Sequence, residues 1–395
     1  MLSFFAYPFL FLAVSLWPFS SAPKPEIKKS SMVIPADLSQ ISHIRILVVE
    51  NASSVKVNTV SPYQVWDGEG HKLFSGTKIV ATTLRPAARG IQMGKQILPA
   101  HTVRIELTGG GEISVGDGRY AHAISVVRNP DGKLDVINEA PVEEYLKGVL
   151  PKEVSARWPP ETLKAQAVAA RTYALFKAIE NKDEPYDVEA DVKSQVYGGR
   201  HSEHPITNQA VEDTRGEVMT YQGKLFPGFF HSTCGGHTTR ADAVWPIEKH
   251  PVLMGVACRF CQGSKHYRWS QKFTTAEIDA ALKKMGFAIS GLMNVAAVDF
   301  DTSGRADNFL IKYRFGQRKI SAVDFRMFMG SYKFKSTIIK SIEPVEGGFV
   351  FKGRGWGHGV GLCQYGSKQL ADLGYTYKQI LDYYYPGQVL KHLDL

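Results

Sequence analysis

The stretch from residue 140 to residue 174 constrains the fold more than any other part of the chain. It reads APVEEYLKGVLPKEVSARWPPETLKAQAVAARTYA, and its second half has the pattern of a buried helix. Pro159 and Pro160 precede Glu161, and proline suits a first helical turn because its missing N–H would be unpaired there in any case. Apolar residues then recur at helical spacing, at Leu163, Ala167, Ala170 and Ala174, with Val168, Leu175 and Ile179 beside them. Because alanine lets a neighbouring element approach closely, we expect this helix at the centre of the fold.

Glu153 lies just before this helix, in a short segment that has apolar neighbours and is broken by prolines. A carboxyl group on a connection held against a buried helix is a candidate for acid–base chemistry. On position alone it is equally an ordinary loop glutamate that caps or pairs structurally. The residues themselves leave both interpretations open.

Composition places the chain among folded globular proteins. Of its 395 residues, 44% are hydrophobic and 22% are charged, so it can bury a large core in one big domain or two smaller ones. The net charge of +9 favours contact with anionic material such as cell-wall polymer, membrane headgroups or nucleic acid, with simple surface charge as the alternative. We expect no nucleic-acid partner, because no dense basic stripe or standard binding motif accompanies the charge. The chain also lacks a Gly-x-Ser-x-Gly elbow, a P-loop and a dinucleotide fingerprint.

The N-terminus indicates the compartment. Residues 4–17 form an apolar run without a charge, followed by the small residues Ser20, Ser21 and Ala22. This pattern predicts a signal peptide or an N-terminal anchor over residues 1–22. The run is shorter than the roughly 20 residues that span a bilayer, whereas Pro23 hinders cleavage after Ala22, so both forms stay open. We expect an exported protein in the periplasm or another extracytoplasmic part of the envelope, which touches the membrane only through this segment.

The remaining chain divides into three parts. Residues 23–40 are polar and rich in Pro and Lys, which predicts a linker. Residues 41–136 contain short β-prone runs separated by Gly, Asn and Asp, which predict a β-rich region. Residues 137–390 mix helical and strand patterns and form the domain that carries the candidate site. The expected fold is α+β, with the β-rich region packed on a mixed core built around the alanine-rich helix.

Cysteine and histidine gather in the second half of the chain. A C-x-x-H pair and a C-x-x-C pair supply four potential ligands, Cys234, His237, Cys258 and Cys261. Two short-spaced pairs suit a tetrahedral zinc ion with a structural role. A disulfide, in an oxidising envelope, and unligated thiols remain alternatives. His231 could replace His237 or face a substrate, while Cys363 is expected to be packed rather than ligating.

Taken together, the motifs resemble the SpoIID/LytB family, the stage II sporulation protein D type. The resemblance covers residues 137–387 and is carried by PVEEYLKGVLPKEVSARWPPETLKAQAVAARTYAL, SQVYGG, FFHSTCGGHT, the CRFC pair and GRGWGHGVGLCQYGSKQLADLGYTYKQILDYYYPG. Members of this family are cell-wall proteins, and the sporulation prototype is a lytic transglycosylase that cuts peptidoglycan glycan strands freed of stem peptides. The resemblance implies a lytic transglycosylase that cleaves MurNAc–GlcNAc bonds in wall remodelling, during sporulation or division.

The resemblance also implies roles for individual residues. Glu153, within LPKEVS, matches the catalytic glutamate of the family. The residues that would line or support the substrate site are Gln166, Arg171, Tyr173, Gln195, Tyr197, His231, Ser232, Trp356, His358, Gln364 and Tyr365. Some members hold zinc with Cys and His just before the Gln-Val-Tyr motif. Residues 183–197 contain neither, so the later Cys/His cluster would have to replace that site.

One glutamate suffices for lytic cleavage. A protonated carboxyl donates to the leaving glycosidic oxygen, and the carboxylate then assists attack of the MurNAc 6-hydroxyl at C1, which gives a 1,6-anhydro product without water. The apolar side chains expected to raise the pKa of Glu153 by desolvation are Val149, Leu150, Val154 and Trp158. The LytB side of the family offers an alternative, a non-catalytic glycan-binding protein that enhances a partner N-acetylmuramoyl-L-alanine amidase.

Overall fold

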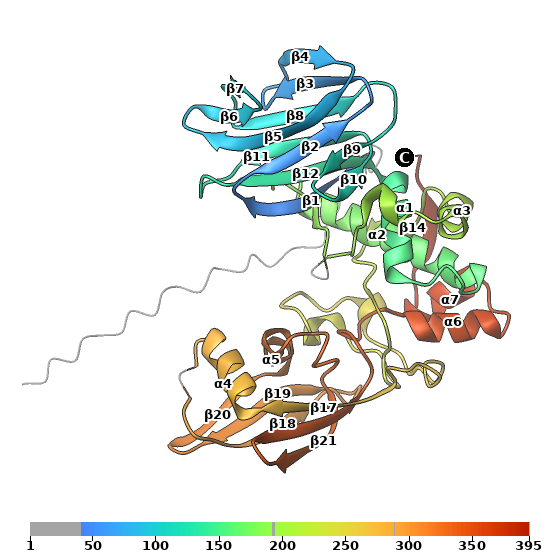
Figure 1. The fold of residues 1–395 in the computed structure, drawn as a ribbon. Helices are drawn as coiled ribbons and strands as arrows, with labels where there is room; N and C mark the ends of the chain where they lie inside the picture. The colour runs from blue at the N-terminus through green and yellow to red at the C-terminus, as the bar shows by residue number, and fades with distance from the viewer. Residues whose placement is uncertain (1–40, 192–193, 288, 395) are drawn as a thin grey trace, which may run out of the picture.

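The computed structural model describes residues 41–191, 194–287 and 289–394. The fold is α+β, as the sequence predicts: a β-sandwich packs on a body of helices and small sheets, from which a second α+β module extends (Figure 1). The segments predicted as signal or anchor (1–22) and linker (23–40) lie outside the described residues. Within the described part of the chain, no helix has both the length and the apolar character needed to cross a membrane.

The sandwich consists of two sheets whose apolar faces pack together. The larger sheet contains β4 (Lys72–Gly76), β3 (Tyr63–Asp67), β8 (Thr102–Leu107), β11 (Ala123–Arg128), β12 (Leu134–Pro141), β1 (His43–Ala52) and β13 (Val188–Glu189), in that order. The smaller contains β10 (Gly118–Tyr120), β9 (Ile113–Val115), β2 (Val55–Thr59), β5 (Ile79–Ala87), β6 (Gly90–Met93) and β7 (Gln96–Leu98). In β2, Val55 and Val57 are buried while Lys56 and Asn58 are exposed, because alternate side chains of a strand point to opposite faces.

The body is built around the alanine-rich helix α2 (Pro160–Glu180), which confirms the predicted central helix. Leu163, Ala167, Ala170 and Ala174 are all fully buried. With α1 (Val142–Glu153), this face of α2 forms one hydrophobic core beneath the sandwich. Other α2 residues, Ala165, Val168 and Ala169, belong to a second core on the opposite side. A single helix thus separates and supports two cores.

Helix α1 extends farther than the sequence suggests. Glu153 is its last residue rather than part of a connection, although Pro151 lies within the final turn. Proline removes one helical hydrogen bond, but burial of Val149 and Leu150 holds this turn in place. The backbone N–H of Val154 donates to the Leu150 carbonyl at 3.0 Å and closes the helix.

The remaining elements of the body pack on these two cores. The helices among them are α3 (Pro205–Asp213), α6 (Gln364–Asp372) and α7 (Tyr377–Tyr384). The short strands are β14 (Glu217–Tyr221), β15 (Lys224–Leu225), β24 (Val389–His392), β16 (Phe230–His231) and β23 (Leu362–Cys363). Strands β16 and β23 pair in parallel, with His231 opposite Cys363. This pairing brings the segment before α6 next to the HSTCGGH motif, far away in sequence.

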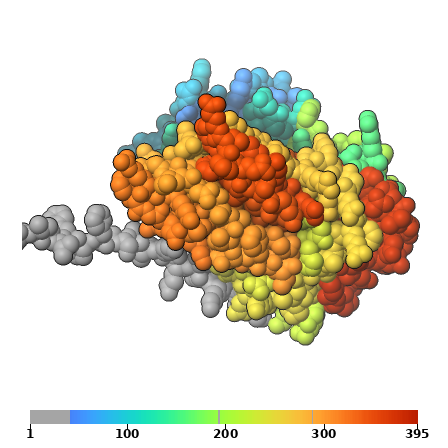
Figure 2. Space-filling model, turned by 90° about the horizontal axis from the view of Figure 1, so that it is seen from below, coloured from blue at the N-terminus to red at the C-terminus, as the bar shows by residue number. Residues whose placement is uncertain are grey.

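Residues 268–354 form a separate unit, which we call the inserted module. It contains β17 (Arg268–Thr274), α4 (Thr275–Lys284), β18 (Leu292–Phe300), β19 (Ala306–Tyr313), β20 (Gly316–Ser321), α5 (Ala322–Met329), β21 (Ile338–Val345) and β22 (Gly348–Arg354). Its own core is rich in phenylalanine, including Phe309, Phe325 and Phe351. The N–H of Gly355 donates to the Tyr267 carbonyl at 3.1 Å, so the chain enters and leaves side by side. Seen from below, the module occupies much of the near face (Figure 2).

Replacing Ala170 by leucine is expected to destabilise the protein, because this fully buried position has no room for a larger side chain. Overpacking of this kind costs about 1–3 kcal/mol, which urea denaturation can measure. Glu180→Leu places the same side chain at the exposed end of α2 and serves as the control. Equal midpoints for the two variants would contradict the close packing of α2.

Candidate functional site

The half-buried carboxyl group of Glu153 is the centre of the candidate site. Its Oε1 accepts a hydrogen bond from the backbone N–H of Val196 at 3.0 Å, and its carboxyl also bonds to the side chain of Gln364. Burial raises the pKa of Glu153, and these two hydrogen bonds oppose the shift without cancelling it. The raised pKa is in the direction expected from the sequence. It favours a carboxyl group that can hold a proton nearer neutrality than an exposed glutamate does.

Helix α6 brings Gln364 to this carboxyl. Gln364 is the first residue of α6, and its Nε2 donates to Oε1 of Gln166 on α2 at 3.4 Å. Both glutamines are buried, and Nε2 of Gln166 has no hydrogen-bond partner among the described residues. The packing of α2 between α1 and α6 therefore sets the distance between Glu153 and Gln364.

The Gln195–Tyr197 segment is held against α1 on the other side of Glu153. The Tyr145 hydroxyl donates to Oε1 of Gln195 at 2.9 Å, and the Tyr197 hydroxyl donates to Oδ1 of Asn138 at 2.8 Å. A Cβ at Gly148 would lie 2.4 Å from the Tyr197 ring, so only glycine permits this contact. Gln195 and Tyr197 are buried. Their hydrogen bonds fix the backbone between them, and with it the Val196 N–H that binds Glu153.

Arg171 is fully buried in a bidentate ion pair with Glu143. Its Nε and Nη2 lie 2.9 and 2.7 Å from the two carboxylate oxygens, and Nη1 donates to the Glu217 carbonyl at 3.0 Å. The N–H of Gly216 completes the shell of Glu143 at 3.0 Å. The resemblance allows Arg171 either to line the site or to support it. A fully buried side chain in an ion pair supports the site.

His231 and His358 lie together but bond to the backbone. Nδ1 of His231 is 3.0 Å from the Val360 carbonyl, and Nε2 of His358 is 2.9 Å from the Phe230 carbonyl. Their ring centroids are 5.5 Å apart. Burial lowers the pKa of His231 to about 3 and that of His358 well below its usual value. Both rings are therefore neutral over the physiological range.

Aromatic rings extend from the neighbourhood of Glu153 to the inserted module, half-buried except for the exposed Tyr332, and we call them the aromatic row. Trp158 meets Tyr365 edge-on at 5.0 Å between centroids. His266 lies 6.5 Å from Tyr365 and 4.3 Å from Trp356, and Tyr332 lies 6.1 Å beyond. Two predicted site residues, Tyr365 and Trp356, are thus brought into one row.

The sequence did not indicate His266, Tyr332 or Lys335 as site residues. The Lys335 ammonium lies 4.5 Å from the centre of the Trp356 ring. These residues stand in no recognisable motif. Tyr332 and Lys335 belong to the inserted module, whereas His266 lies just before it, so long-range packing brings all three to the row. Of the other predicted site residues, Tyr173 is buried against Phe229 at 5.9 Å and burial raises its pKa to about 12. Ser232 accepts the Tyr365 N–H at its carbonyl at 3.1 Å.

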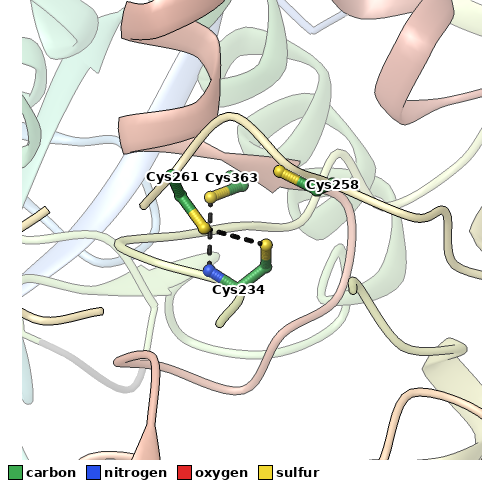
Figure 3. A group of neighbouring side chains, drawn as sticks. All are labelled: Cys234, Cys258, Cys261 and Cys363. Atoms are coloured by element: carbon green, nitrogen blue, oxygen red, sulfur yellow. Dashed lines mark hydrogen bonds between the residues drawn. The ribbon is translucent and has the colours of Figure 1, made fainter. Parts of the chain in front are cut away.

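The four cysteines converge in the second core, and this group differs from the predicted set of metal ligands. The sulfur atoms of Cys234, Cys258, Cys261 and Cys363 all lie within 4.8 Å of one another (Figure 3). His237 is outside this group, and its Nδ1 lies 2.5 Å from the Thr238 carbonyl. Cys363, expected to be only packed, takes the fourth place because β23 pairs with β16 beside Cys234. We call these four residues the cysteine cluster.

The raised pKa of Glu153 predicts how stability depends on pH. Folding favours its protonated form, so the stabilisation is complete below the unfolded pKa of about 4.3 and is lost as pH rises through the higher folded pKa. Glu153→Gln cannot ionise, and we expect its Tm to exceed that of the wild type near neutrality and to match it at about pH 4. Glu144→Gln, on the same helix, is the control for thermal denaturation. A lower Tm for Glu153→Gln at neutral pH would contradict the prediction.

Comparisons with known proteins agree with the sequence motifs. A family model described as Stage II sporulation protein matches residues 130–221, which include α1 and α2, and one for a domain of unknown function (DUF8618) matches residues 255–361, which include the inserted module. An uncharacterized protein of Brachyspira hyodysenteriae is 37% identical over 253 residues, 64% of this chain and 67% of that protein. Stage II sporulation protein D of Bacillus subtilis is 28% identical over 273 residues, 65% of this chain and 76% of that protein.

The amidase enhancer of Bacillus subtilis is 30% identical over 289 residues, which are 62% of this chain. The matched part is 40% of that relative, so the likeness covers less than half of its length. The motif order, the family model and these relatives lead to one conclusion: the chain belongs to the SpoIID/LytB family.

Proposed function

We propose that the protein is a peptidoglycan lytic transglycosylase that cleaves MurNAc–GlcNAc bonds in glycan strands freed of stem peptides. The observation that carries the proposal is the carboxyl group of Glu153, half-buried, raised in pKa and bonded to Val196 and Gln364. Family membership and relatives named for sporulation and for amidase enhancement support a role in cell-wall remodelling. They also support an extracytoplasmic location.

The proposed reaction uses Glu153 twice. The protonated carboxyl donates its proton to the glycosidic oxygen as the bond from that oxygen to C1 of MurNAc breaks. The 6-hydroxyl oxygen of the same sugar then bonds to C1, and its proton passes to the Glu153 carboxylate. The products are a 1,6-anhydro-MurNAc end and a new free chain end, and the glutamic acid is restored without water. The proposed mechanism needs one acid, unlike that of a two-carboxylate hydrolase.

The aromatic row supports a glycan as substrate. Aromatic faces attract the partly positive C–H groups of sugar rings, and a row of rings gives an extended chain repeated contacts. The row ends at Lys335. Burial lowers the pKa of this ammonium group, and the positive charge of nearby Lys265 lowers it further. Every MurNAc without a stem peptide carries a free lactyl carboxylate. Positive charge beside the rings therefore favours strands in this form.

A second function remains because one relative is an amidase enhancer. In that case the protein binds denuded glycan through the aromatic row and recruits an N-acetylmuramoyl-L-alanine amidase without cutting. The two proposals share the glycan and differ in the reaction. Detection of anhydro-MurNAc ends distinguishes them.

Glu153→Gln is expected to abolish most glycan cleavage. Loss of a general acid–base group lowers rates by about 10²- to 10⁴-fold, and the neutral amide can still accept the Val196 hydrogen bond. Denuded glycan strands are incubated with each protein, and anhydro ends are counted by mass spectrometry. Glu144→Gln, whose carboxylate pairs with Lys147 on the same helix, should retain activity.

Three outcomes decide the assignment. Anhydro ends from the wild type but not from Glu153→Gln support it. Full cleavage by folded Glu153→Gln refutes the role of this residue. Wild-type protein that binds the strands, makes no ends and accelerates an added amidase favours the enhancer function.

Trp356→Ala is expected to weaken glycan binding by about 1 kcal/mol, or roughly fivefold in Kd. The exposed Phe315→Ala, at the tip between β19 and β20, removes an aromatic ring away from the row and is the control. Binding is measured with Glu153→Gln as the background, so that strands stay intact. Equal losses of glycan affinity in both variants would show that the aromatic row is not part of the proposed glycan site.

A further inference from the structure

We infer that Cys234, Cys258, Cys261 and Cys363 bind one Zn²⁺, and that this ion anchors the start of α6 beside Glu153. The second half of this inference rests on the proposed function, whereas the metal site does not. The site replaces the predicted ligand His237 by Cys363. It joins two loop segments, one with Cys234 and one with Cys258 and Cys261, to the start of α6 at Cys363.

The geometry of the sulfur atoms suits a tetrahedral metal ion. Four thiolates at about 2.3 Å from zinc lie about 3.8 Å from one another. All four sulfurs here lie within 4.8 Å of one another, and those of Cys234 and Cys261 are 3.3 Å apart. A disulfide requires about 2.05 Å and joins only a pair. Figure 3 shows the four side chains pointing toward a common centre.

Hydrogen-bond groups surround the sulfurs as they do in thiolate metal sites. The N–H of Cys234 donates to Sγ of Cys363 at 3.2 Å, and the N–H of Gly236 donates to Sγ of Cys234 at 3.4 Å. The Tyr384 hydroxyl lies 3.2 Å from Sγ of Cys258. A Cβ at Gly366 would meet this hydroxyl at 2.0 Å and the same sulfur at 3.0 Å, so glycine keeps the space open. Such outer contacts orient ligands and tune metal affinity.

A buried cation lies beside the cluster. Arg305, from the inserted module, is almost fully buried, and its Nη2 and Nη1 donate to the carbonyls of Cys234 at 2.8 Å and His237 at 2.9 Å. Its Nε has no hydrogen-bond partner among the described residues. Zn²⁺ with four thiolates has a net charge of −2, which needs positive charge nearby in a dry core. Arg305 supplies it.

The cluster lies where three parts of the protein meet. Cys258 and Cys261 precede the inserted module, and Cys363 follows it as the N-cap of α6. The next residue, Gln364, bonds to Glu153, and Tyr365 packs on Trp158. A metal ion that fixes Cys363 therefore also fixes the positions of Gln364 and Tyr365 at these two contacts. The cysteine cluster is positioning rather than catalytic, because none of its atoms reaches Glu153 directly.

The test compares Cys363→Ser with His237→Ala in the full-length protein. The wild type should contain about one zinc per chain after dialysis against EDTA, measured by elemental analysis, with all four thiols titrating only after denaturation with chelator. His237→Ala should keep its zinc. Cys363→Ser should lose it or bind at least about tenfold more weakly.

Two results would overturn the metal site. One is a folded wild type without zinc whose cysteines are paired in disulfides or react freely as thiols. The other is zinc that persists in Cys363→Ser and disappears in His237→Ala. The first result depends only on the zinc content of the wild type. The metal site can therefore be tested even if Cys363→Ser does not fold.

The positioning role has its own readout. Zinc removal should change the fluorescence of Trp158, obtained as the difference between the wild type and Trp158→Phe, and should lower kcat for glycan cleavage with little change in KM. Bound zinc whose removal alters neither signal would overturn the positioning role alone. A zinc-loaded protein that makes no anhydro ends would refute the proposed function and leave the metal site standing.

Discussion

The close packing of α2 is the constraint on which the other parts depend. Its alanines face α1 and the sandwich on one side, and Phe226, Leu362 and Leu370 on the other. No face of its middle turns is left to solvent, so each polar residue on it must find a partner inside the protein. Arg171 finds Glu143, and Gln166 finds Gln364. The candidate site is built from the residues that pair with the buried polar side chains of α2.

The two buried polar contacts have different energetic roles. The Glu143–Arg171 pair is satisfied on nearly every side, and removal of one member would leave a buried charge, a change that costs about 3–5 kcal/mol in comparable cases. The chain from Gln166 through Gln364 to Glu153 is less complete, because Nε2 of Gln166 is unpaired in the described structure. Incomplete satisfaction of buried groups is typical of places where a ligand completes the network. Arg171 and Gln166 thus differ in how fully their buried polar groups are satisfied, although both lie on α2.

Local sequence patterns predicted the elements whose signals are local. The two prolines and the apolar spacing predicted a buried helix that opens at Glu161, and α2 begins one residue earlier, at Pro160. Glu153 was expected in a connection because prolines normally end helices, yet burial of Leu150 carries α1 past Pro151. Cys363 and His266 could not be placed, since the strand pairing of the first and the ring contacts of the second with Trp356 and Tyr365 join parts of the chain that are distant in sequence. His237 had ligand spacing, but its ring contacts the backbone carbonyl of the next residue, Thr238.

The hydrogen bond between Gly355 and Tyr267 has a consequence for how the chain folds. Since the two ends of the inserted module touch, the module is a closed loop on the body, and its length does not change the distance between those ends. Closing a loop costs only about 0.6 kcal/mol more for each doubling of its length, and a module that folds first removes even this cost. The body can therefore accept additions and deletions in the module at little expense to its own stability. A chain of this design can change the module while the helices that position the carboxyl group of Glu153 stay the same.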